Sequence, residues 1–268
     1  MKRKALEDVI IRHISSMEKH CHRLPGSFDP EDIHDLRVDY KKTRAFLRLL
    51  QLDKKTGDMH IPDKLKAVYQ NGGKVRDLQL FLAQLQAMEV VPGLPVCVAH
   101  WNRQLFTCKE QVVRSIEAVH FKKLLGDITK ELPPQLHDDT LKKFIQRKIA
   151  AIHIVLLAAD NEKNLHTIRK HLKDLIYVSR IYENEWDIPF PISGWKSEKE
   201  LSDMAATLGD FNDRCLELSL LQSGYSNDCG DDEKDKLQEL QKNWQQQKET
   251  QQRQLLQQVQ ALKMEYAF

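Results

Sequence analysis

The feature that most constrains the fold is a pattern that occurs twice along the chain. A basic triplet with the spacing 0, 3 and 7 recurs at an offset of 132 residues, and a Gly-x-x-x-Asp motif recurs at an offset of 136. Two motifs at nearly one offset indicate that a structural unit has been duplicated. The positions concerned are His34, Arg37 and Lys41 against His166, Arg169 and Lys173, and Gly73 and Asp77 against Gly209 and Asp213.

Each repeat is expected to be a four-helix unit, because the apolar residues keep helical spacing and no segment alternates as a strand does. The fold class is therefore all-α: two pseudo-twofold-related four-helix bundles, residues 1–132 and 133–268, in a single domain over 1–268. Leu24–Ser27 is expected to break the first helix and Asn71–Gly73 to bend or interrupt the third. The expected helices are 3–22, 30–52, 62–88, 96–118, a short one near 120–130, 137–159, 161–184, 196–222 and the Gln-rich segment 233–266, for which disorder is the alternative.

Composition narrows the class of protein. No segment approaches the roughly 18 apolar residues that cross a membrane, and no signal peptide follows the basic start, so no membrane partner is expected. The five cysteines form no Cys-x-x-Cys pair and indicate reduced thiols in a cytoplasmic protein. His20, Cys21 and His22 are adjacent and point in different directions from a helix, so neither a metal nor another cofactor is expected.

The charge distribution is more informative than the formal net charge of +2. Residues 1–134 carry 23 Lys+Arg and 17 Asp+Glu, a net of +6, and the remainder carry 18 and 22, a net of −4. At 100° per residue, the first basic motif extends into one stripe within about 80° of the helix surface and about 21 Å long. It consists of His34, Arg37, Lys41, Arg44 and Arg48.

The second stripe has the same angular positions. It consists of His166, Arg169, Lys173 and Arg180, with Ile176 at the place of Arg44. A line of positive charge without interleaved acids is what a linear polyanion needs, since Arg and Lys both bind phosphate oxygens. A solvated charged face, or histidines with partners in the core, are the alternatives.

These motifs resemble those of the CHAD family, named for conserved histidines in an α-helical domain. The resemblance covers about residues 3–222 and includes His34-x-x-Arg37, Gly73-x-x-Arg76-Asp77, His166-x-x-Arg169-Lys170 and Gly209-x-x-Asn212-Asp213. It implies two bundles facing each other across a basic central surface or pore, binding of inorganic polyphosphate, and association with polyphosphate granules. The family usually has Arg where this chain has Ile176, so the second face is expected to bind more weakly unless Arg180 compensates.

The candidate ligand-binding residues come from the stripes, their flanks and the glycine motif. Asp77 and Asp213 are interpreted as structural, either capping a helix that restarts after the glycine or pairing with a stripe arginine. Sulfate or phosphate ions are expected to bind at the same positions in crystals. The candidates are His34, Arg37, Lys41, Lys42, Arg44, Arg48, Lys74, Arg76, His166, Arg169, Lys170, Lys173 and Arg180.

The predicted function is non-catalytic binding of inorganic polyphosphate. No phosphate-binding Gly-rich loop, hydrolase nucleophile motif or acidic metal cluster is present, so the chain is not expected to be an enzyme. Nucleic acid or another phosphorylated ligand is the alternative, although no aromatic platform for bases accompanies the stripes. A polyphosphate-processing enzyme using His34 or His166, and a scaffold using the Gln-rich helix, remain weaker hypotheses.

Overall fold

The computed structural model describes residues 1–53, 59–157, 161–186, 198–224 and 229–260. These residues form α-helices, one 3₁₀ turn and no strand, which confirms the all-α class. None of the helices described is long and apolar enough to cross a membrane. The elements are α1 (Arg3–Ser27), α2 (Pro30–Leu50), α3 (Asp63–Ala87), η1 (Val91–Gly93), α4 (Pro95–Glu117), α5 (Phe121–Lys130), α6 (Asp138–Leu157), α7 (Glu162–Trp186), α8 (Glu198–Ser223) and α9 (Asp231–Gln260).

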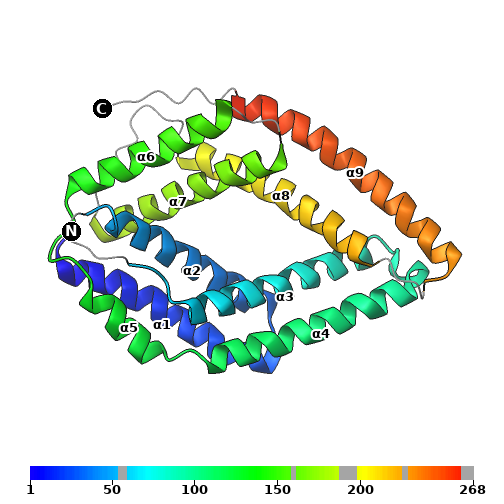
Figure 1. Ribbon diagram of the computed structural model, residues 1–268, viewed down its shortest axis with the longest axis horizontal. Coiled ribbons are helices and arrows are strands. Elements are labelled where there is room, and N and C mark those ends of the chain that lie inside the picture. Colours follow the sequence, from blue (N-terminus) through cyan, green and yellow to red (C-terminus); the bar gives the residue numbers. More distant parts are fainter. Residues whose placement is uncertain (54–58, 158–160, 187–197, 225–228, 261–268) are drawn as a thin grey trace.

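Helices that follow one another in the sequence pack in pairs, and the two halves meet through their second and third helices. Helix α1 packs on α2, α3 on α4, α6 on α7, and α8 on both α7 and α9. Between the halves, α2 packs against α7 and α3 against α8. Figure 1 shows α1 to α5 on one side of the molecule and α6 to α9 on the other. The two basic stripes, which lie on α2 and α7, are thus carried by neighbouring helices.

Two apolar clusters hold this arrangement. The larger contains the buried faces of α1, α2, α5, α6 and α7. The smaller joins the distal ends of α3, α4, α8 and α9, where Phe81 meets Trp101 and Trp244 edge to face at 4.8 and 6.2 Å. The indole Nε1 of Trp101 donates to the carbonyl of Leu220 at 3.1 Å, so its polar atom has a partner within the core. This second cluster fixes α4 of the first half to α8 and α9 of the second.

Two helices continue where a break or bend was predicted. Helix α1 passes through Pro25 and ends at Phe28, which has a left-handed φ of 49° and donates its N–H to the carbonyl of Leu24 at 2.9 Å. The buried Leu24 and the part-buried Phe28 hold this last turn in the core, which offsets the hydrogen bond that proline cannot donate. Helix α3 runs without interruption through Gly72 and Gly73, both of which are buried. The Gln-rich segment is helical through Gln260, so disorder is the wrong alternative over the residues described.

Candidate polyanion-binding site

Lys41 lies within a group of basic side chains contributed by both α2 and α7. Burial, followed by the charges of Arg37, Arg169, Lys173 and Arg44, lowers the pKa of its amino group to about 7. Burial and the charges of Arg169 and Arg180 likewise lower the pKa of Lys173. Such effects require like charges nearby in a poorly solvated region, so cations from the two repeats share one region of the molecule. The cationic cluster is defined here as Arg37, Lys41, Arg44, Arg169 and Lys173.

Carboxylates do not neutralise the cationic cluster. Within the described residues, none of its five members forms an ion pair with an acidic side chain. Asp77 is an acid on which the charges of Arg37 and Lys41 act. Burial raises the pKa of Asp77 to about 6; the charge of Arg37 lowers the pKa and the charge of Asp213 raises it. The aspartates of the two glycine motifs therefore lie close enough to influence each other. The cluster retains an excess of positive charge beside this pair.

The glycine of each repeated motif lies against the arginine of the corresponding stripe. A Cβ on Gly73 would overlap the guanidinium Nη1 of Arg37, which donates to the carbonyl of Tyr69 at 3.0 Å. A Cβ on Gly209 would stand 3.3 Å from Nε of Arg169, tighter than ordinary contact. These glycines allow a close approach of helix and side chain and do not mark a turn.

The interpretation of the two motif aspartates is therefore wrong in both of its forms. Helices α3 and α8 are continuous through Asp77 and Asp213, so neither carboxylate caps a restarting helix. Neither forms an ion pair with a stripe arginine among the residues described. The charges of Arg37 and Asp213 both act on the buried carboxyl group of Asp77.

Two tyrosines accompany the cluster, which the sequence did not suggest. The rings of Tyr40 and Tyr69 stack at 4.1 Å with 13° between their planes. The guanidinium of Arg37 lies 4.7 Å from the Tyr69 ring centre, and that of Arg44 lies 5.8 and 5.9 Å from the two rings. These distances are in the range of cation–π attraction, which orients the guanidinium groups. Tyr40 is buried, so this pair supports the arginines and is not an open platform for bases.

Several nitrogen atoms around the cluster are buried without a hydrogen-bond partner among the described residues. They are Nε of Arg44, Nε of Arg169 and Nδ1 of His166 and His171. Burial, then the charges of Lys170 and Arg169, lowers the pKa of His166, while a hydrogen bond with Asn212 acts in the opposite direction. Buried polar atoms are rarely left unpaired in folded proteins, so ordered water or a bound ligand is expected to complete the hydrogen bonding around the cluster.

Arg48, at the end of the α2 stripe, has a carboxylate partner. Its Nη1 lies 2.9 Å from Oδ2 of Asp174, and Nζ of Lys148 on α6 lies 2.5 Å from the same oxygen. Asp174 is only 3% exposed. The sequence did not point to Lys148 or Asp174, because their proximity depends on how α6 packs against α7. Arg48 therefore bridges the two halves, and it shares the single carboxylate of Asp174 with Lys148.

Three other candidates on α2 and α3 have neighbours outside the cluster. Nη2 of Arg76 pairs with Glu31 at 3.1 Å. The charge of Lys42 contributes to the lowered pKa of Asp39, which is hydrogen-bonded to His13 of α1. Lys74 is exposed and lines a hollow between α3 and α4.

The remaining candidates lie at the edges of the cluster. His34 and Lys170 are exposed, and the charge of Lys170 acts on His166. Nη2 of Arg180 lies 3.5 Å from the hydroxyl of Ser202, and the positive charge of Arg180 helps to lower the pKa of Lys173. Ile176 is 2% exposed and belongs to the larger apolar cluster. This residue, which stands where the family usually has arginine, therefore packs in the core.

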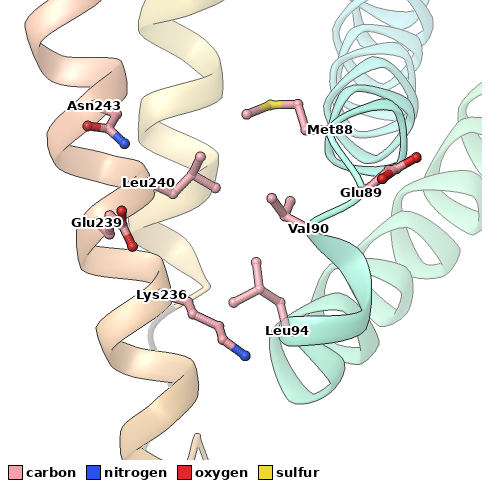
Figure 2. A pocket seen from close by; sticks show the side chains of 9 residues that line it. Met88, Glu89, Val90, Leu94, Lys236, Glu239, Leu240 and Asn243 are labelled. Atoms are coloured by element: carbon pink, nitrogen blue, oxygen red, sulfur yellow. The ribbon is translucent and has the colours of Figure 1, made fainter.

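The hollow between α9 and the connection from α3 to α4 does not suit a polyanion. It has a volume of about 460 Å³. Figure 2 shows Met88, Val90 and Leu94 facing Leu240 across it, with the amino group of Lys236 at one end. Its charged lining is two glutamates, Glu89 and Glu239, against the one lysine. A pocket that combines apolar walls with net negative charge repels phosphate groups.

Comparison with known proteins agrees with this architecture. The family model of the CHAD domain matches residues 8–222. The crystal structure of the CHAD domain from the plant Ricinus communis superposes with a TM-score of 0.65 at 15% sequence identity, over 99% of this chain and 89% of that one. At this identity the similarity shows the fold alone. No curated protein matches the chain significantly.

Proposed function

The chain belongs to the CHAD domain family, and we propose that it binds inorganic polyphosphate without catalysis at the cationic cluster. The observation that carries this proposal is the environment of Lys41, whose pKa is lowered to about 7 by burial and by cations from both α2 and α7. Gathering like charges in a poorly solvated region costs folding free energy. A ligand with closely spaced negative charges reverses that cost.

The chemistry of the cluster suits a chain of phosphate groups. Three of its five members are arginines, whose planar guanidinium groups donate two parallel hydrogen bonds to phosphate oxygens. The guanidinium groups of Arg44 on α2 and Arg169 on α7 supply such donors from neighbouring helices. A single phosphate can engage only part of this set, whereas a linear polyphosphate can contact α2 and α7 together.

Nucleic acid remains the alternative ligand, and the tyrosine pair argues against it. Tyr40 is buried, and the Tyr69 ring already lies 4.7 Å from the guanidinium of Arg37. Recognition of single strands relies on aromatic faces that stack on bases. Displacement of bound polyphosphate by RNA or DNA at equal phosphate concentration would favour the nucleic-acid hypothesis.

The direct test is a titration of long-chain polyphosphate against the wild type and the double variant Arg37→Glu/Arg169→Glu. The control is Lys122→Glu/Lys123→Glu, which makes the same change in net charge at two exposed positions of α5. We expect the first variant to lose at least about 100-fold in affinity, which is about 1.4 kcal/mol for each tenfold change, and the control to bind like the wild type. Equal losses of affinity in both variants would mean that polyphosphate responds to the net charge of the protein and not to the cationic cluster.

The absence of catalysis has its own test. We expect no release of phosphate from polyphosphate in the presence of Mg²⁺. Release that depends on His34 or His166, and is lost in His34→Ala or His166→Ala, would instead support the processing enzyme.

A further inference from the structure

A second cluster of reactive side chains lies where the first turns of α4 and α9 meet, at the far end from the N-terminal helices. Sγ of Cys97 lies 3.3 Å from Sγ of Cys229. One carboxylate oxygen of Glu233 accepts a hydrogen bond from the backbone N–H of Cys97 at 3.0 Å. The two sulfur atoms and a carboxylate oxygen all lie within 4.8 Å of one another, and the three residues are 0%, 3% and 6% exposed.

This set contains an acidic side chain in a buried site. Within the described residues, no basic side chain forms an ion pair with Glu233, which accepts hydrogen bonds from the backbone N–H and the thiol of Cys97. A buried carboxylate without a cation is costly. The surrounding core of Leu94, Trp101 and Leu237 is apolar and offers no counter-charge. A positive ion bound here would compensate the negative charge of the Glu233 carboxylate.

We propose that Cys97, Cys229 and Glu233 bind a divalent transition-metal ion of the Zn²⁺ type. Two thiolates and one carboxylate are ligands that Zn²⁺ accepts, at about 2.3 Å for sulfur and about 2.0–2.2 Å for oxygen. In tetrahedral geometry these lengths place two sulfurs roughly 3.7 Å apart. The sulfur atoms, 3.3 Å apart in the free protein, must therefore separate by about 0.4 Å when the ion binds. Water completes the coordination. The ion joins the start of α4 to the start of α9, and so fixes the first half of the chain to the second.

A disulfide between Cys97 and Cys229 is the competing chemistry, and the geometry favours it less. The sulfur atoms are farther apart than the roughly 2.05 Å of a bond. A carboxylate next to the two thiols has no role in a disulfide, whereas it is a ligand for a cation.

The test uses the full chain, kept reduced by a phosphine and stripped with a chelator. Zn²⁺ is titrated in competition with a chromophoric chelator, and Co²⁺ is followed by absorption. We expect one equivalent of Zn²⁺ to bind, a rise in Tm on binding, and thiolate-to-cobalt charge transfer in the near ultraviolet. Cys97→Ser and Cys229→Ser should each lower the affinity for Zn²⁺ by at least about 100-fold, since each removes one of three protein ligands.

Cys108→Ser, on the same helix as Cys97, is the matched control and should bind Zn²⁺ like the wild type. Circular dichroism of the metal-free proteins checks that the variants fold. Should they fail to fold, the Co²⁺ spectrum of the wild type decides alone. Absence of the charge-transfer band, equal binding in the serine variants, or a disulfide that forms in air and leaves Zn²⁺ without effect would overturn the proposal.

Discussion

The guanidinium of Arg37 occupies the space that a side chain on Gly73 would need. A Cβ at Gly73 would overlap Nη1 and stand 2.9 Å from Cζ of Arg37. Gly73→Ala is therefore expected to displace the guanidinium and weaken polyphosphate binding about as much as Arg37→Gln does. A loss of roughly tenfold or more corresponds to about 1.4 kcal/mol, the value of one charge-assisted hydrogen bond. Isothermal titration with a polyphosphate of defined length measures it.

Gly126→Ala is the control for that substitution. Gly126 is also helical, on α5, and an added Cβ there meets nothing within 4 Å. The change should leave polyphosphate affinity unaltered and stabilise the protein by up to about 1 kcal/mol through helix propensity. Unchanged affinity in Gly73→Ala would mean that the position of the Arg37 guanidinium does not matter for binding.

The affinity for polyphosphate should fall as pH rises above 7. The pKa of Lys41 is lowered to about 7 in the free protein, and a bound polyanion raises it because it stabilises the charged amino group. Below pH 7 the lysine is charged in both states. Above pH 7 binding must take up a proton, and this continues until the pH exceeds the pKa of the complex.

Calorimetry in two buffers of different ionisation enthalpy measures the proton uptake directly at pH 8. Lys41→Arg stays charged throughout, so its affinity should change little over the same range. An identical pH profile in wild type and Lys41→Arg would assign the titration to other groups, such as Asp77 or His166.

Lys41→Met should stabilise the protein while weakening ligand binding. The pKa of Lys41 is about 7 when folded and 10.5 in the reference state, so the charged lysine destabilises the fold most below pH 7 and progressively less toward pH 10.5. We expect Lys41→Met to raise the free energy of unfolding at pH 6 by about 1–3 kcal/mol. Urea unfolding at pH 6 and pH 9 checks the sign and the trend, and a loss of stability at both would contradict it.

Asp174→Asn should act in opposite directions on stability and on binding. Asp174 is buried and accepts from Arg48 and Lys148, so its loss leaves two cations without their carboxylate. We expect the free energy of unfolding to fall by about 2–4 kcal/mol and polyphosphate affinity to rise, since the released charges adjoin the cationic cluster. Parallel losses of stability and affinity would instead place Arg48 and Lys148 outside the ligand's reach.

Much of the architecture could be predicted from periodicity alone. The all-α class and the bounds of α2 and α4 follow from local spacing, caps and proline positions, which are properties of single helices. The breaks expected at Pro25 and Gly72 were wrong because tertiary contacts decide them. A buried last turn holds α1 together, and the approach of Arg37 explains the glycine next to Gly72.

The site was predicted only where it depends on one helix face. The angular positions of Arg37, Lys41 and Arg44 are local, whereas the partners of a side chain depend on which helices meet. The pairing of Arg48 with Asp174 spans 126 residues, so no spacing rule could reveal it. The same holds for Cys97 and Cys229, which lie 132 residues apart and form no local Cys-x-x-Cys pattern.

The most direct test of the central proposal is a crystal structure of the protein with tripolyphosphate. We expect phosphate oxygens within about 3 Å of guanidinium nitrogens from both helices, including those of Arg44 and Arg169. Phosphate groups found only at exposed lysines such as Lys122 and Lys123, with the cationic cluster empty, would contradict it.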